Sequence, residues 1–94
     1  MRKESLLTPE RKCWVCGNPH SVAHHVYGGA RRQISDREGC WVWLCPFHHN
    51  MSDDAVHFNR ELDERLKREM QLAWQTAHDA DREDFIAVFG KGYV

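Results

Sequence analysis

Apolar residues recur with a helical period through the second half of the chain. Their spacing of three or four positions puts them on one face of a helix, while charged residues between positions 60 and 68 occupy the other face. The apolar positions are Phe58, Leu62, Leu66, Met70, Ala73 or Trp74, and Ala77. The pattern predicts a long amphipathic helix over about residues 58–78, whose charged face is a candidate docking surface for a partner protein.

A second, shorter helix is predicted near the end of the chain. Asp81 and Asp84 are spaced as in a helix start, where the first acid caps the backbone and the second favours the helix dipole. The apolar residues 85–89 follow, and Gly90 is typical of a helix end. We expect this helix to pack on the long helix or on the elements that precede it.

The first half of the chain predicts strands instead. Residues 40–44 are aromatic and β-branched, and residues 21–27 form another candidate strand that ends at two glycines. A basic loop that carries Arg31, Arg32 and Arg37 is expected to join the two strands into a hairpin. Pro46 then fits the first turn of a helix.

These elements predict an α+β fold in a single domain of 94 residues. The strands and the following helix form a small core at about residues 13–57, and a helical extension covers about residues 58–94. A chain this short buries a modest share of its surface and often needs a disulfide or a metal ion to hold its fold.

Whether the four cysteines form disulfides or bind a metal ion depends on the cellular compartment of the protein. The first residues lack the apolar stretch of an export signal, and no segment is long and apolar enough to cross a membrane. We therefore expect a cytoplasmic protein that does not bind membranes. Thiols stay reduced in the cytoplasm and bind metals there.

Two pairs of residues have the spacing of metal ligands: Cys13-x-x-Cys16 and Cys45-x-x-His48. Together they match a closed, tetrahedral structural zinc site. The alternatives are free thiols in the core, or a site completed by His49 rather than His48. His24, His25 and His49 then have no structural role assigned, which favours a second metal and hydrolytic chemistry over a pair of ordinary surface histidines.

Charge is distributed unevenly along the chain. Residues 1–40 contain seven Lys and Arg against four acids, whereas residues 41–94 contain six against ten, and the formal net charge is −1. The half that carries the cysteine and histidine motifs is thus the basic one. A bound divalent cation would make the site still more positive than the formal count.

The residues quoted above resemble a known motif. Cys13-x-x-Cys16, His24-His25 and the run from Leu44 to His49 together look like the zinc-supported form of the HNH endonuclease motif. The resemblance covers about residues 13–57 and implies a ββα-metal fold that holds one catalytic divalent cation. The C-terminal segment also resembles small phage and prophage proteins with this core, which implies a bacterial host or a phage as the source.

The resemblance assigns a role to each residue that matches the motif. His25 is implied to be the general base, and His24 and His49 are implied to bind the catalytic metal. A further ligand one helical turn on would be Asp53, with His57 as the alternative.

One position departs from the motif. Cys40 stands where the family usually has an asparagine that fixes the loop and the base. Ser35 and Asp36 are the nearby residues that could take over this task. Otherwise Cys40 is expected to be a buried apolar thiol.

The expected chemistry is hydrolysis of DNA phosphodiester bonds. An imidazole can take the proton of the attacking water, and a bound cation stabilises the leaving oxygen. Imidazole ligands suit Mg²⁺, Mn²⁺, Ni²⁺ or Zn²⁺ better than Ca²⁺. The arginines at 31, 32 and 37 would contact phosphates, unless they belong to a solvated loop. The competing interpretations are an inert zinc-stabilised module that binds nucleic acid or protein, and an accessory factor of phage recombination.

Overall fold

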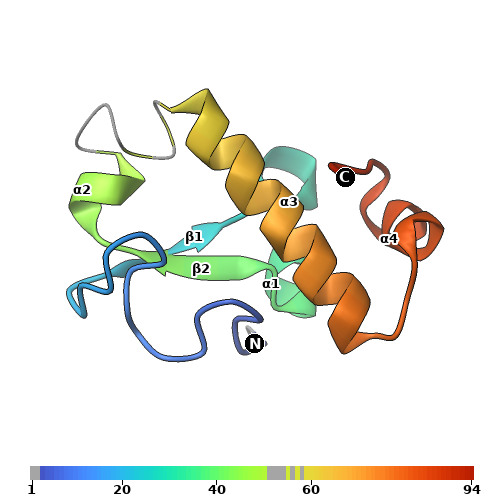
Figure 1. Cartoon of the computed structure of the whole chain (residues 1–94), viewed down its shortest axis with the longest axis horizontal. Coiled ribbons are helices and arrows are strands. Elements are labelled where there is room, and N and C mark those ends of the chain that lie inside the picture. The colour runs from blue at the N-terminus through green and yellow to red at the C-terminus, as the bar shows by residue number, and fades with distance from the viewer. Residues whose placement is uncertain (1–2, 51–54, 56, 58) are drawn as a thin grey trace.

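A computed structural model describes residues 3–50, 55, 57 and 59–94, and it has an α+β architecture (Figure 1). A two-stranded antiparallel sheet is combined with helices. In chain order the elements are β1 (Val22–His25), η1 (Gly29–Arg31), α1 (Arg32–Glu38), β2 (Trp41–Leu44), α2 (Pro46–His49), α3 (Arg60–Ala77) and α4 (Arg82–Phe89). No described helix combines the length and apolar character needed to span a membrane.

The two strands pair as predicted, with His24 opposite Val42 and His25 opposite Trp41. The segment between them is not the basic loop expected from the sequence, because η1 and α1 occupy most of it. Gly39 ends α1 at a φ of 77°, and a Cβ there would lie 2.6 Å from the carbonyl oxygen of Glu4. Only glycine fits this close, left-handed turn, which returns the chain into β2.

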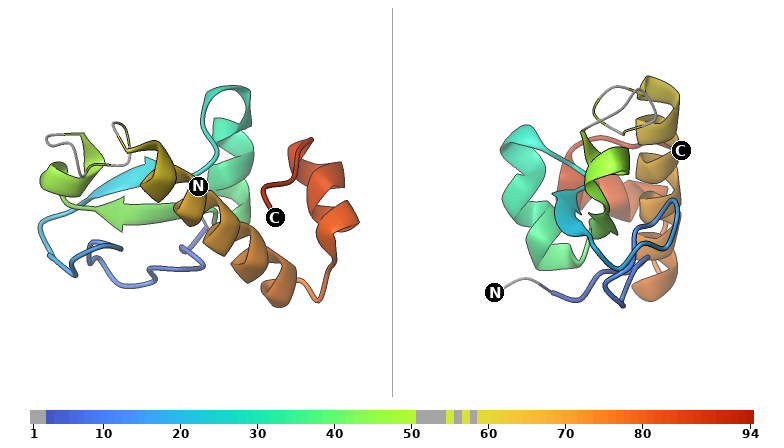
Figure 2. Two further views of the ribbon diagram at one scale, coloured as in Figure 1. Left: turned by 45° about the horizontal axis from the view of Figure 1, so that its top comes forward. Right: turned by 90° about the vertical axis from the view of Figure 1, so that its left-hand side faces the viewer.

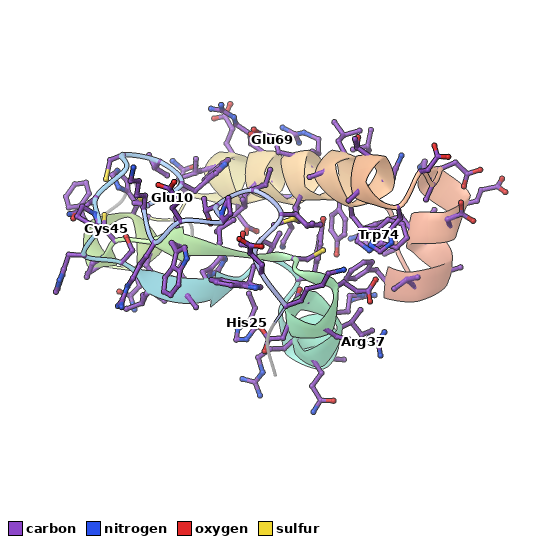
Figure 3. All side chains as sticks on the ribbon, turned by 90° about the horizontal axis from the view of Figure 1, so that it is seen from below. Glu10, His25, Arg37, Cys45, Glu69 and Trp74 are labelled. Atoms are coloured by element: carbon purple, nitrogen blue, oxygen red, sulfur yellow. The ribbon has the colours of Figure 1, made fainter. Side chains whose placement is uncertain are left out.

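The hairpin lies between two helices. Figure 3 shows α3 on one side of the strands and α1 on the other, and the right-hand view of Figure 2 shows the same order. Successive side chains of a strand point to opposite faces. Neighbouring residues of β1 therefore reach different surroundings, one near α3 and one near α1.

The two C-terminal helices begin where the sequence predicts. Asn59 caps α3 by accepting a hydrogen bond from the Leu62 amide, and Asp81 and Asp84 form a reciprocal capping box at α4. Leu66, Met70 and Trp74 of the apolar stripe are buried, as expected. Two details of the stripe differ: Ala77 is exposed, and Gln71 is fully buried because its side chain binds backbone amides. Phe58 lies outside the described residues.

Helix α2 is shorter than the spacing of its histidines suggests. It ends at His49, where Asn50 leaves the helical conformation with a φ of −156°. His57 nevertheless returns beside this helix, since its amide donates to the His49 carbonyl at 3.4 Å. The helix that begins at Pro46 therefore does not run far enough to place His49 and His57 on one of its faces, and Asp53 lies outside the described residues.

Candidate metal centres and cavity

Cys13, Cys16, Cys45 and His48 lie close enough to bind one metal ion. The Sγ atoms of Cys16 and Cys45 are 3.7 Å apart, and His48 Nδ1 lies 3.3 Å from Cys45 Sγ and 3.7 Å from Cys13 Sγ. A tetrahedral zinc ion separates two sulfur ligands by about 3.8 Å and a sulfur from a nitrogen by about 3.6 Å. The cluster fits these separations, and all four cysteines are free of disulfides.

Two short turns bring these ligands together. After the first pair, the Gly17 amide donates to the Cys13 carbonyl at 2.8 Å, and Gly17 has a φ of 77°. Cys45 precedes α2, and its carbonyl accepts from the His48 amide at 3.0 Å. The Trp14 amide donates to the Trp43 carbonyl at 2.8 Å, so the first turn is attached to β2.

The surroundings of Cys13 favour its ionised form. Burial opposes ionisation of this thiol, but hydrogen bonds with the backbone of Cys45, Cys16 and Val15 outweigh that effect and lower its pKa to about 7. The thiolate is the form that binds metal. The donor set, and the ionised form of Cys13 within it, are suited to zinc.

A second cluster consists of His24, His49 and His57, each offering one ring nitrogen. The Nε2 atoms of His49 and His57 are 3.1 Å apart, and the ring centre of His24 is 5.2 Å from each of the other two. Two imidazole nitrogens on one tetrahedral ion are about 3.3 Å apart. Three residues from β1, the end of α2 and the segment after it thus lie close enough to share an ion.

His24 is the least exposed member of this second cluster, at 9%. Its Nε2 atom is buried and has no hydrogen-bond partner, the single such side-chain atom found among the described residues. Burial, together with His49 and His57, lowers the pKa of His24 to about 3. A neutral imidazole whose buried nitrogen has no hydrogen-bond partner can serve as a metal ligand.

His25 has different neighbours from the histidine beside it. Its Nε2 atom lies 3.1 Å from Oδ2 of Asp36 in α1, and the two side chains are 27% and 31% exposed. Figure 3 shows His25 on the α1 side of the hairpin, away from α3. A carboxylate only accepts hydrogen bonds, so Nε2 of the neutral ring carries the hydrogen and Nδ1 keeps its lone pair.

Ser35 and Asp36 of α1 both make contacts with residues at the end of β1 or just after it. Ser35 Oγ accepts from the Tyr27 amide and donates to the Tyr27 carbonyl, both at 3.0 Å, which fixes the chain just after β1. Asp36 contacts His25 itself. Cys40 is fully buried, and burial raises its pKa to about 12. This thiol is therefore a neutral core residue.

A cavity of about 440 Å³ joins the histidines. Residues along β1 form its floor, the three clustered histidines lie at one part of it, and α1 and α3 contribute charged side chains. Its lining residues are Ala23, His24, His25, Val26, Gly28, Arg32, His49, His57, Asp63 and Lys67. No sequence pattern singles out Asp63 and Lys67, since both belong to a helix that carries many charged residues.

The three arginines expected to contact nucleic acid have separate environments. Arg31 is half-buried and its Nε donates to the Phe89 carbonyl at 2.6 Å, so it ties η1 to the end of α4. Arg32 is exposed and lines the cavity. Arg37 is exposed, with Nε 3.5 Å from the Glu38 carboxylate. Only Arg32 of the three reaches the cavity.

Comparison with known proteins adds no assignment. No protein-family model, curated protein or solved structure matches the chain. Function must therefore be argued from the geometry of the site.

Proposed function

We propose that this chain is a metal-dependent endonuclease of the HNH type, which hydrolyses DNA phosphodiester bonds with His25 as general base. The observation that carries the proposal is the pairing of adjacent histidines on β1. His24 contributes a buried, unpaired nitrogen to a three-histidine cluster, and His25 is oriented by a carboxylate beside the same cavity. This combination supplies a cation site and a base within one residue of each other.

The chain's own residues support a proton transfer at a defined atom. Asp36 accepts from Nε2 of His25 and leaves Nδ1 available to take the proton of an attacking water. Ser35 binds the Tyr27 backbone just after β1 and so helps to fix the strand that carries His25. A cation held by His24, His49 and His57 would stabilise the negative charge that develops on the leaving oxygen.

The donor set bears on which cation is used. Three imidazoles, and no carboxylate among the described members of the cluster, favour Zn²⁺, Ni²⁺ or Mn²⁺ over Mg²⁺, which prefers oxygen ligands. The Cys₃His cluster is a separate site that leaves no ligand position open. We assign it a structural zinc ion.

DNA is the proposed substrate because the cavity combines the cation site with basic side chains. Arg32 lies at the start of α1 and is exposed at the cavity, where it can contact a phosphate. The competing function is an inert zinc-stabilised module that binds nucleic acid or protein, alone or as a recombination accessory factor. Such a module would not need an oriented base.

The test is a plasmid-nicking assay with Mg²⁺, Mn²⁺, Ni²⁺ or Zn²⁺, combined with measurement of bound metal. We expect His25→Ala to keep both metals and to lose cleavage by about two to four orders of magnitude, the usual contribution of a positioned base. His57→Ala should lose the second metal together with activity. His20→Ala is the matched control, since His20 is exposed and belongs to neither cluster.

Two results would reject the nuclease. One is a His25→Ala variant that cleaves as fast as wild type, and the other is a protein that binds no second divalent ion at the three histidines. Either result would leave the binding module as the better interpretation.

A further inference from the structure

Helix α3 carries three ion pairs of spacing i, i+4, and one of them differs from the others. Lys67 Nζ lies 2.9 Å from Asp63 Oδ2, and both side chains are only 27% exposed. The Arg60–Glu64 pair is 91% and 49% exposed, and the Arg65–Glu69 pair is 66% and 41% exposed. The Asp63–Lys67 pair is thus partly desolvated, although its sequence spacing is the same.

The reason is that Asp63 and Lys67 face the cavity that contains the candidate base and the histidine cluster. Lys67 and His24 line the same cavity. A positive side chain therefore stands beside the cation site on the α3 side. Arg32 supplies a second positive side chain from the start of α1.

The position of Lys67 relative to β1 is fixed by the backbone. The Tyr27 hydroxyl donates to the Lys67 carbonyl at 2.7 Å, and Tyr27 lies two residues after the end of β1. Tyr27 is 1% exposed, so this hydrogen bond is buried at its donor end. The helix turn that carries the ammonium is therefore attached to the strand that carries both His24 and His25.

We propose that Lys67 is a phosphate-binding residue of this cavity, whose ammonium contacts a DNA phosphate next to the bond that His25 attacks through water. Asp63 holds the ammonium over the cavity while it is free of DNA. This proposal rests on the proposed nuclease function. It adds to the site a residue from a helix outside the part of the chain that resembles the HNH motif.

A purely structural role for Lys67 makes a different prediction. If Lys67 served only to neutralise Asp63, removing both charges together would leave DNA binding unchanged. Asp63→Asn with Lys67→Met does this and keeps the net charge of the chain at its wild-type value. The matched control is Arg60→Met with Glu64→Gln, which removes an exposed pair of the same spacing from the same helix.

Binding is measured in a His25→Ala background with zinc-loaded protein, so that cleavage does not interfere. The probe is a fluorescently labelled DNA duplex of about 20 base pairs, titrated by anisotropy at several NaCl concentrations. Loss of one phosphate contact lowers the slope of log K against log salt by about 0.9 and the affinity by roughly three- to tenfold. We expect this loss for the Asp63/Lys67 double variant and no change for the control.

The proposal is overturned if the Asp63/Lys67 double variant binds the duplex with the affinity and salt slope of its parent. If wild type still nicks plasmid, that result removes Lys67 from the site and leaves the nuclease in place. A parent that binds no duplex and a wild type that nicks no plasmid would reject both proposals.

A further single variant keeps the idea testable if the double variant does not fold. Asp63→Asn retains Lys67 and removes a negative charge from the cavity, so it should raise the affinity for the same duplex. An affinity no higher than that of the parent would also overturn the proposal.

Discussion

At the scale of single residues, the site depends on two consecutive histidines with opposite surroundings. A strand turns alternate side chains to opposite faces, so His24 is buried near α2 and His25 is partly exposed near α1. Burial keeps His24 neutral and available as a ligand, whereas the carboxylate of Asp36 orients His25. One short strand can therefore supply a ligand and a base without placing them on the same face.

The contact between Asp36 and His25 gives a prediction at this scale. We expect Asp36→Ala to lower the cleavage rate by about ten- to a hundredfold, as the loss of an orienting partner usually does. It should also reduce the share of His25 rings that carry hydrogen on Nε2, which ¹⁵N NMR of the imidazole measures. Asp36→Asn, which still offers an accepting oxygen, should restore part of both. An unchanged tautomer population in Asp36→Ala would show that Asp36 does not orient the base.

The residue types of both clusters were predictable, because cysteine and histidine at ligand spacing indicate metal binding whatever the tertiary fold. The contact of Asp36 with His25 was open to sequence reasoning only as one of two candidates. Lys67 was not predictable, since nothing in the sequence distinguishes it from the other charges of α3. The difference arises from burial, which the structure alone gives.

At the scale of elements, the four-residue helix α2 serves two clusters at once. Successive residues of a helix point about 100° apart, so His48 turns toward the thiols and His49 toward His24. The Cys₃His cluster thus fixes the element that places His49. A short helix of this kind has little stability of its own and depends on such an anchor.

This dependence predicts that loss of the structural zinc abolishes the histidine cluster as well. Cys16→Ser, or removal of zinc by a chelator, should unfold the hairpin and α2, because metal binding supplies much of the folding free energy. Zinc content and far-UV circular dichroism measure the effect. Cys40→Ala is the matched control: Cys40 lies outside both clusters, so this variant should keep its zinc. A Cys16→Ser protein that remains fully folded without metal would contradict the structural role.

Sequence reasoning succeeded for elements with strong local signals. The capping box of α4, the apolar stripe and the two strands all rest on residues close together in the chain. It missed α1, whose mixed composition has no clear apolar period and whose end is fixed by contact of Gly39 with the distant Glu4. It could not give the end of α2, since histidine spacing does not show where a helix stops.

At the scale of the whole molecule, one buried cluster extends from Cys13 to Phe89. Tyr27 lies at its centre, with its ring 5.5 Å from Phe85, 4.9 Å from Phe89 and 5.0 Å from Tyr93. The C-terminal helix and the chain after it thus pack against Tyr27, two residues after the end of β1. No local pattern predicts this arrangement, because it joins segments far apart in the sequence.

Gln71 gives the last prediction, because it fastens the end of the chain to the middle of α3. Its Oε1 atom accepts from the amides of Tyr93 at 2.6 Å and Val94 at 3.1 Å, and the residue is fully buried. Gln71→Ala should lower the free energy of unfolding by about 2–4 kcal/mol, since two hydrogen bonds are lost and buried groups are left unpaired.

Urea denaturation of the zinc-loaded protein measures this loss, with Gln33→Ala, an exposed glutamine on α1, as the control. Because Tyr93 stacks on Tyr27 and Tyr27 binds the Lys67 carbonyl, the same variant should also weaken DNA binding through Lys67. A Gln71→Ala protein as stable as the Gln33→Ala control would mean that the contacts of Gln71 with Tyr93 and Val94 do not stabilise the fold. In that case the position of Lys67 would depend on the Tyr27 hydrogen bond alone.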